Sequence, residues 1–189
     1  MENTSPAKVP AFLWAVIIVL LAGLYSYAAY FDPTRPNKTV ENFYQAYFNG
    51  DYDTVASNLS VFWAVRLLPQ YAEMKPAELL TNRAKIEKDL RKAIAEVEKT
   101  NAAPKDIKIE VMKPYTKEGE TSAVVVYKFM EKSKEAGMEA AILIKEQGRF
   151  RIFTMTQVDE QSLAQIKAVD ISELDTNFKE LLTTTDTSK

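Results

Sequence analysis

The chain contains no cysteine and no histidine, and these two absences exclude several kinds of chemistry. Without cysteine there is no disulfide framework, and no thiol can carry the lipid of a lipoprotein anchor. Without histidine there is no Ser–His–acid or Cys–His catalytic arrangement, no imidazole metal ligand and no common general base near neutral pH. Any catalysis would have to use carboxylate, tyrosine or lysine side chains. The sequence therefore predicts a protein that is not an enzyme and has no catalytic residue, metal site or cofactor.

A large net charge is also lacking. The formal charge at pH 7 is −2, from 24 basic and 26 acidic residues that are mixed along the chain. A near-neutral, slightly acidic surface produces no field that would attract nucleic acid. We therefore expect no nucleic-acid partner.

The feature that the chain does have is one long apolar stretch near its amino end. The segment Ala11–Phe31 runs for 21 residues without a charged side chain, and its aromatic residues gather at its two ends. At about 1.5 Å per helical residue, it is long enough to cross a hydrocarbon core of about 30 Å. The pattern predicts a transmembrane helix over 11–31, preceded by a disordered tail over 1–10. The lipid bilayer is then an expected partner.

Two features of this segment leave alternatives open. Ser26, Tyr27 and Ala28 could form the small-x-small site of a cleaved signal peptide, although the apolar run is longer than such peptides have. Basic residues flank both ends, with Lys8 before and Arg35 after, so the positive-inside rule does not decide the orientation. A short tail before the helix and a large domain after it favour a signal anchor. We expect a single-pass protein of the cell membrane with its C-terminal domain outside the cytoplasm.

Beyond the apolar stretch, helical periodicity extends as far as about Thr100. Two prolines predict a stiff linker over 32–38. Thr39 is expected to cap a first amphipathic helix, which Gly50 ends, and Asp51 to cap a second one. The apolar segment Val61–Lys75 is read either as a further helical turn or as a short strand that brings four side chains to the core, Phe62, Trp63, Leu67 and Leu68. From Pro76 we expect one long helix with the stripe Leu79, Arg83, Ile86, Leu90, Ile94 and Val97.

From Asp106 the apolar period changes from 3.6 to 2, which indicates strands. Short turn sequences separate the runs, so the sequence predicts an antiparallel meander of four strands. The predicted strands are Ile107–Met112, Ser122–Lys132, Met138–Lys145 and Phe150–Val158. The predicted turns between them are Pro114–Thr121, Lys132–Gly137 and Glu146–Arg149.

A helical tail is predicted over 159–189. One segment carries Leu163, Ile166 and Val169, and a second segment is expected to begin at Ser172, with Asp175 at the reciprocal capping-box position. The second segment has an apolar stripe that must be buried either on its own domain or on another protein chain. That stripe consists of Leu174, Phe178, Leu181 and Leu182.

Two segments of the chain resemble a known superfamily. Phe43–Ser60 (FYQAYFNGDYDTVASNLS) resembles the opening two helices of the nuclear-transport-factor-two-like superfamily, which has the ketosteroid-isomerase-like cone fold, and Leu143–Ile152 (LIKEQGRFRI) resembles its last hairpin. The resemblance covers about residues 39–158. It implies an α+β cone-fold domain with three helices packed on a curved four-stranded antiparallel sheet around a pocket, followed by the tail over 159–189.

The resemblance also implies what to look for in the pocket. Enzymes of the superfamily place Asp or His in the cone; this chain has no histidine, and Asp51 is explained more simply as a helix cap. Aromatic residues of the first helices and of the sheet are candidates to line the pocket, although aromatic residues at helical spacing also suit a plain core. The candidate lining residues are Phe43, Tyr44, Tyr47, Phe62, Trp63, Tyr127, Phe129 and Phe150.

These features together favour a binding or assembly module that is anchored in the membrane and is not catalytic. Its expected partners are the lipid bilayer and either a second copy of the chain or another membrane protein. The alternative is a protein that binds a small apolar ligand, or a carboxylate-based enzyme, that uses the interior of the cone.

Overall fold

The structure is a computed structural model that describes residues 18–22, 35–99 and 106–183. The chain divides into two compact units, Met1–Asp32 and Pro33–Lys189. In the first unit residues 18–22 are helical and exposed. The part of the chain that the structure describes contains no helix with both the length and the hydropathy needed to cross a membrane. The predicted tail over 1–10, most of the predicted span over 11–31 and residues 32–34 of the predicted linker lie outside the described residues. The linker prediction is wrong for residues 36–38, which are helical.

The first helix of the second unit, α2 (Pro36–Asn49), begins three residues earlier than predicted. Pro36 occupies its first turn, where a missing backbone N–H costs nothing and the fixed φ angle suits a helix. The expectation that Thr39 caps this helix is therefore wrong. Thr39 is buried instead, and its hydroxyl donates to the carbonyl oxygen of Phe150 at 3.1 Å.

The first helix ends at the predicted residue, and the second helix begins where predicted. Gly50 has the positive φ of 70° that ends α2. Asp51 caps α3 (Tyr52–Asn58) by accepting a hydrogen bond from the backbone N–H of Thr54 at 3.1 Å. The next segment is helical, in the short helices α4 (Val61–Ala64) and η1 (Pro69–Tyr71). Of the four side chains expected in the core there, Leu68 is buried, Phe62 and Trp63 are half-buried, and Leu67 is exposed.

The single long helix predicted from Pro76 is wrong, because two helices, α5 (Pro76–Thr81) and α6 (Arg83–Glu98), stand in its place. Asn82 separates them. Its side-chain amide donates to the carbonyl oxygen of Glu78 at 2.8 Å, and asparagine side chains that bond to nearby backbone in this way compete with regular helix. The residues of the predicted stripe are buried on α5 and α6, except for Val97, which is 53% exposed.

The sheet is antiparallel and has five strands rather than the four expected. They are β1 (Ile107–Val111), β2 (Lys117–Glu118), β3 (Ser122–Glu131), β4 (Lys134–Glu146) and β5 (Arg149–Gln157). The strand order is β1-β3-β4-β5, and the additional short strand β2 also pairs with β3. The chain turns within the predicted segment 132–137, but the turn is shorter than predicted, because Glu131 pairs with Lys134 and leaves only Lys132 and Ser133 in the turn.

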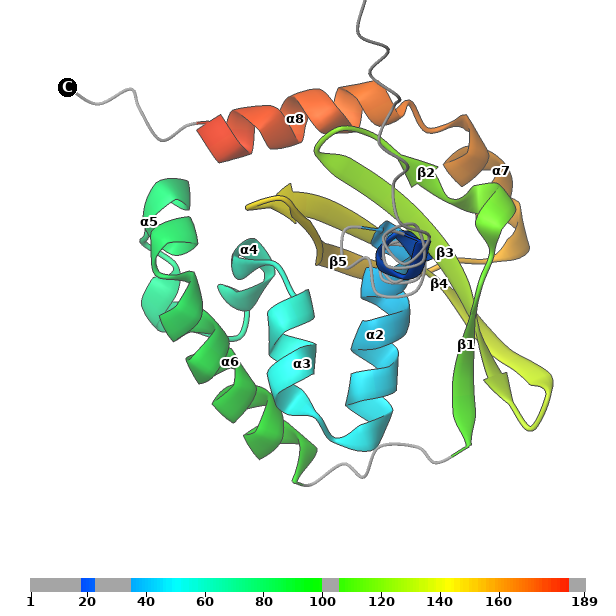
Figure 1. Cartoon of the computed structure of the whole chain (residues 1–189), viewed down its shortest axis with the longest axis horizontal. Coiled ribbons are helices and arrows are strands. Elements are labelled where there is room, and N and C mark those ends of the chain that lie inside the picture. The colour runs from blue at the N-terminus through cyan, green and yellow to red at the C-terminus, as the bar shows by residue number, and fades with distance from the viewer. Residues whose placement is uncertain (1–17, 23–34, 100–105, 184–189) are drawn as a thin grey trace, which may run out of the picture. The chain divides into compact units, whose positions relative to one another are not determined.

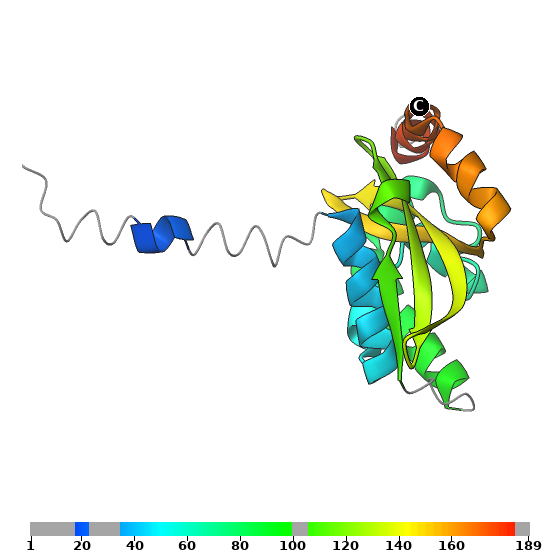
Figure 2. The same ribbon diagram turned by 90° about the vertical axis from the view of Figure 1, so that its right-hand side faces the viewer.

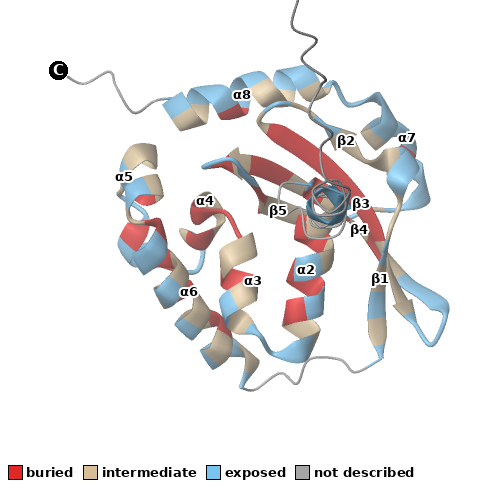
Figure 3. Ribbon diagram, in the orientation of Figure 1, coloured by how far each residue is buried: buried red, intermediate tan, exposed pale blue. Residues whose placement is uncertain are grey.

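The two faces of the sheet bury different clusters of side chains, which we call the helix side and the outer side. Successive residues of a strand point to opposite faces. Val125 and Tyr127 of β3 join the large core that α2, α3 and α6 cover on the helix side, and Val126 between them joins a smaller cluster on the outer side. Figure 1 shows these helices gathered beside the sheet, and Figure 3 shows buried residues on both the helices and the strands.

The outer side is covered by α7 (Glu160–Ala168), and α8 (Ile171–Thr183) crosses one end of the sheet (Figures 1 and 2). Leu163 of α7 packs in the outer cluster with Val126, Met138 and Ala140. On α8, Phe178 is 6% exposed and its ring centroid lies 5.0 Å from that of Phe153 in β5. The apolar stripe of the tail is therefore buried at Phe178 on its own domain.

Candidate functional site

The eight aromatic residues proposed to line a pocket lie between the helices and the sheet. Phe43, Tyr44, Tyr127 and Phe150 are buried, and Tyr47, Phe62, Trp63 and Phe129 are partly buried against the same core. Their rings pack on one another, as shown by the edge-to-face contact between Tyr44 and Phe129 with centroids 5.2 Å apart. In this arrangement the aromatic side chains fill the interior of the fold.

A polar cluster lies among these rings. The hydroxyls of Tyr44 and Tyr127 both donate to Oε2 of Glu139, at 2.9 and 2.8 Å, and lie 3.0 Å from each other. Burial, with the neighbouring Glu139 carboxylate, raises the pKa of both phenols well above their usual range, so both stay protonated near neutral pH. Two phenols that share one carboxylate oxygen can hold a carboxylate in place or present it to a ligand.

The sequence analysis proposed Tyr44 and Tyr127 as pocket-lining residues and did not single out Glu139. A single glutamate in a strand carries no signal that separates an internal position from a solvated one. Tyr44 also borders a hollow of about 440 Å³ between α2 and β1, together with Phe48, Ile107 and Ile109. One residue of the predicted aromatic set, Tyr44, therefore borders an opening.

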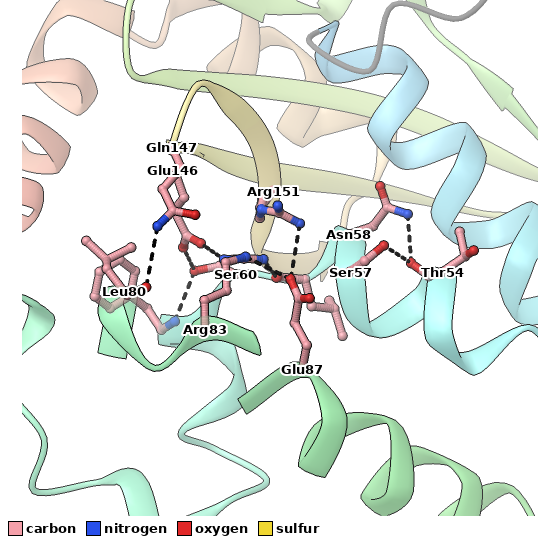
Figure 4. Close-up of polar contacts among 12 residues, drawn as sticks. Thr54, Ser57, Asn58, Ser60, Leu80, Arg83, Glu87, Glu146, Gln147 and Arg151 are labelled. Atoms are coloured by element: carbon pink, nitrogen blue, oxygen red, sulfur yellow. Dashed lines mark hydrogen bonds and ion pairs between the residues drawn. The ribbon is translucent and has the colours of Figure 1, made fainter. Parts of the chain in front are cut away.

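A second polar cluster is buried where the β4–β5 hairpin meets α6 (Figure 4). Glu146 is 0% exposed and accepts a hydrogen bond from the Ser60 hydroxyl at 2.5 Å. The Arg83 guanidinium pairs with the other carboxylate oxygen of Glu146 and donates to the carbonyl oxygen of Leu59 at 3.0 Å. Burial raises the pKa of Glu146, while Arg83 and Ser60 act in the opposite direction. The cluster joins the α3–α4 corner, α6 and the hairpin.

Two further charges extend this cluster toward the surface. Glu87 lies 2.8 Å from Nε of Arg83 and 3.6 Å from Nη1 of Arg151 (Figure 4). Burial, with Arg83 nearby, lowers the pKa of Arg151 to about 10, so the side chain stays charged near neutral pH. The alternation of two cations and two carboxylates compensates each charge. We interpret this cluster as a structural element, because its central members are buried in the fold.

A different kind of site lies on the outer side of the sheet, between α7 and α8. It is a hollow of about 570 Å³, within the usual range for small-molecule pockets. Strands β3, β4 and β5 supply its floor, and both helices supply its walls. Its apolar lining consists of Val124, Ala140, Ile142, Val158, Ile166, Val169 and Leu174, and its polar lining includes Gln157, Gln165, Asp170, Glu173 and Asn177.

Asp175 fixes the position of α8 beside this hollow. Its carboxylate accepts hydrogen bonds from the backbone N–H groups of Glu120, Thr121 and Ser122 at 2.7, 3.0 and 2.8 Å, and from the Ser122 hydroxyl at 2.6 Å. The expectation that Asp175 completes a capping box with Ser172 is therefore wrong. Asp170 accepts the hydrogen bond from the backbone N–H of Ser172 instead, at 2.9 Å.

The connection between α7 and α8 is also held by a polar contact. Nζ of Lys117 donates to the carbonyl oxygen of Val169 at 2.5 Å. The sequence placed Ile166, Val169 and Leu174 on apolar stripes of the tail but gave no sign that a hollow would remain among them. Whether two helices close on a sheet or stay apart depends on contacts between segments far apart in the chain, such as Asp175 with the turn before β3.

The described residues contain no group of three or more acidic side chains that could hold a metal ion. The chemistry that the geometry offers is therefore that of two carboxylate-centred clusters on the helix side and an apolar hollow with an acidic rim on the outer side. No family model matches the chain, and no curated protein and no solved structure matches it.

Proposed function

We propose that the chain is a single-pass membrane protein whose C-terminal domain, outside the cytoplasm, acts as a binding or assembly module without catalysis. The uncharged stretch over 11–31 supports the membrane anchor. The unit Pro33–Lys189 holds both hydrophobic clusters and so has a core of its own. The helix and strand order is compatible with a cone fold of the nuclear-transport-factor-two-like type. The partners are the bilayer and a protein, either a second copy or another membrane protein.

One observation carries the proposal of binding through a surface. On the helix side the space between helices and sheet is filled by packed aromatic side chains, and Tyr127 and Phe150 are at most 2% exposed. An apolar hollow instead opens on the outer side, beside α8. Close packing of the aromatic interior, together with an outer hollow of about 570 Å³ that exceeds the 440 Å³ hollow beside Tyr44, favours recognition at the surface over a reaction in the interior.

Membrane attachment is tested by fractionation of cells that express the full chain, followed by alkaline carbonate extraction. The wild-type chain should stay with the membranes. Replacing Leu20 and Leu21 by Arg should release it, because a charge in a bilayer core costs about 2.5–3.5 kcal/mol per residue on insertion scales. The matched control is Leu67→Arg, at an exposed position of the domain, which should stay in the membrane fraction. Recovery of the wild type as a soluble chain that begins near Ala29 would contradict the anchor.

Partner binding is tested by site-specific photocrosslinking in intact membranes. A photoreactive residue at Ile166 or Leu174 lies in the hollow, and one at Val97 is an exposed apolar control on α6. We expect adducts of one defined size at the two hollow positions and none at Val97. Equal labelling at all three positions would count against a specific binding face.

The second candidate is binding of a small apolar ligand, or carboxylate chemistry, at the cluster of Tyr44, Tyr127 and Glu139. The observation that favours it is that two buried phenols converge on one partly exposed carboxylate. Thermal-shift screening with apolar and aromatic compounds tests it, because a bound ligand raises the unfolding temperature. A hit should lose its effect in Glu139→Gln and keep it in Glu118→Gln, an exposed carboxylate outside the cluster. If no compound stabilised the protein, this second candidate would be rejected and only the surface-binding proposal would remain.

A further inference from the structure

The hollow on the outer side is held open by contacts of its walls. Apolar side chains on two helices that face an apolar sheet would normally close on that sheet, because burying them is favourable. Here α8 is attached at the end of the sheet through Asp175, and the α7–α8 connection through the contact of Lys117 with Val169. Phe178 fixes α8 to β5 at the same end. Ile166 of α7 packs against the outer cluster, α8 is held at the end of the sheet, and a hollow of about 570 Å³ remains between the two helices and the floor.

The charges of the lining are of one sign. Asp170 and Glu173 are both exposed carboxylates on the α8 side of the hollow, and its lining includes no lysine and no arginine. Hydrogen bonds from Ser172 and the nearby Lys117 ammonium lower the pKa of Asp170, whereas Glu173 has no hydrogen-bond or ion-pair partner among the residues described. The part of the floor that β3 and β4 supply is apolar, since Val124 and Ala140 are 5% and 4% exposed and Ile142 lies beside them, whereas β5 contributes the polar Thr156 and Gln157. A molecule that complements this surface is apolar over most of its length and positively charged at one end.

We propose that the hollow between α7, α8 and the sheet binds a small amphiphile with an apolar body and a single cationic group. The body lies on Val124, Ala140 and Ile142, and the cation lies beside Asp170 and Glu173. Amide side chains at the rim, Gln165 and Asn177, complete the polar end of the site. The inference goes beyond the proposed binding of a protein, because it assigns a small-molecule ligand class to the same hollow.

The experiment uses two probes that differ in charge and share the same chain, octyltrimethylammonium and octyl sulfate. Each is titrated calorimetrically into the full-length protein in lipid nanodiscs, and an identical titration into empty nanodiscs is subtracted. The cation should bind about tenfold more tightly than the anion, which corresponds to about 1.4 kcal/mol. The double variant Asp170→Asn with Glu173→Gln should lose this preference. The control variant Glu118→Gln with Glu131→Gln removes two exposed carboxylates that do not line the hollow, and it should keep the preference.

The place of binding is tested by filling the hollow. Ala140→Phe puts a ring on its floor and should weaken binding of both probes, while Ala164→Phe, at an exposed position of α7 outside the lining, should not. Should Ala140→Phe not fold, the charge variants at the exposed rim still decide the matter. Equal binding of the two probes, no binding above empty nanodiscs, or an unchanged preference in the Asp170 and Glu173 variant would each overturn the inference. Membrane retention and crosslinking would be unaffected by such a failure, so the two proposals can fail separately.

Discussion

Glu146 is a fully buried carboxylate whose charge is compensated by Arg83, and the pair lies where three segments meet. Removing one member of a buried ion pair leaves the other without compensation, which typically costs 3–5 kcal/mol. In Glu146→Gln, Arg83 would still have Glu87 at 2.8 Å, so its charge would stay partly compensated. We therefore expect the lower end of this range, a free energy of unfolding reduced by about 3 kcal/mol. Urea unfolding monitored by circular dichroism measures it.

The control for this prediction removes both charges. The double variant Arg83→Met with Glu146→Leu replaces the pair by apolar side chains of similar size, which is often close to neutral in stability. We expect it to be more stable than Glu146→Gln alone. If Glu146→Gln had wild-type stability, the ion pair would contribute nothing to the stability of the fold.

Asp175 makes stability depend on pH in acid. Partial burial acts to raise the pKa of this carboxyl, but hydrogen bonds from Ser122, Glu120 and Thr121 outweigh it and lower the pKa from 3.8 to about 2. A carboxyl whose pKa is lower in the folded state stabilises the fold above its unfolded pKa. That contribution, about 2 kcal/mol, is lost as the pH falls from about 4 to about 2. The difference in unfolding free energy between wild type and Asp175→Asn should therefore be largest near neutral pH and shrink toward pH 2.

A pair of glycine variants checks that the bonds to Asp175 carry this effect. A Cβ at Gly119 would lie 2.4 Å from the Asp175 carboxylate, whereas a Cβ at Gly137 would meet nothing within 4 Å. Gly119→Ala should displace the carboxylate and reproduce the loss seen in Asp175→Asn, and Gly137→Ala should not. A constant difference between wild type and Asp175→Asn at every pH would assign its stabilisation to packing.

Among the strands, the β3–β4 hairpin has a turn whose backbone strain can be relieved by substitution. The β3–β4 turn has only two residues, Lys132 and Ser133, with φ angles of 48° and 69°. Two-residue hairpin turns with positive φ at both positions prefer Asn-Gly, because other side chains are strained there. Replacing the pair by Asn and Gly should raise the free energy of unfolding by about 0.5–1 kcal/mol, as measured in urea.

The other hairpin supplies the comparison. Gln147 and Gly148 form its turn with φ angles of 51° and 82°, so glycine already stands at the second position. Gly148→Ala should destabilise by a similar amount, because its Cβ would meet no neighbour and only the backbone angle is strained. If the Asn-Gly turn between β3 and β4 gave no gain, strain there would not limit stability.

Local signals predicted most elements, and contacts between distant segments decided the rest. Gly50 ended α2 and Asp51 capped α3 as expected, because both effects act within one turn of chain. The break at Asn82 was missed, since a polar residue inside a helical pattern does not show where its amide will bond. Asp175 was assigned to a local cap because its real donors lie more than 50 residues away in the sequence.

At the scale of the whole molecule, the sequence predicted the α+β class and the antiparallel order of the main strands. It identified the aromatic residues of the interior but not how closely they pack, because ring contacts such as that between Phe43 and Tyr44 depend on side-chain geometry. The outer hollow was not predictable, since its residues come from β3, β4, β5, α7 and α8. Periodicity gives the apolar face of each element and not the distance at which two such faces are held.

The helical tail over 159–189 should behave as part of the domain and not as a separable appendage. Leu163 and Phe178 are 9% and 6% exposed, and α7 covers Val126 and Met138 on the outer side. Full burial of a large apolar side chain contributes about 1.5–3 kcal/mol, so a chain that ends at Val158 should lose about 3–6 kcal/mol and expose an apolar face. Urea unfolding and binding of a fluorescent apolar dye measure the two effects, and a chain that ends at Thr183 is the control that should keep wild-type values. If the chain that ends at Val158 kept full stability and bound no dye, the helical tail would be separable, and the outer hollow would have to be explained without a role in holding the fold together.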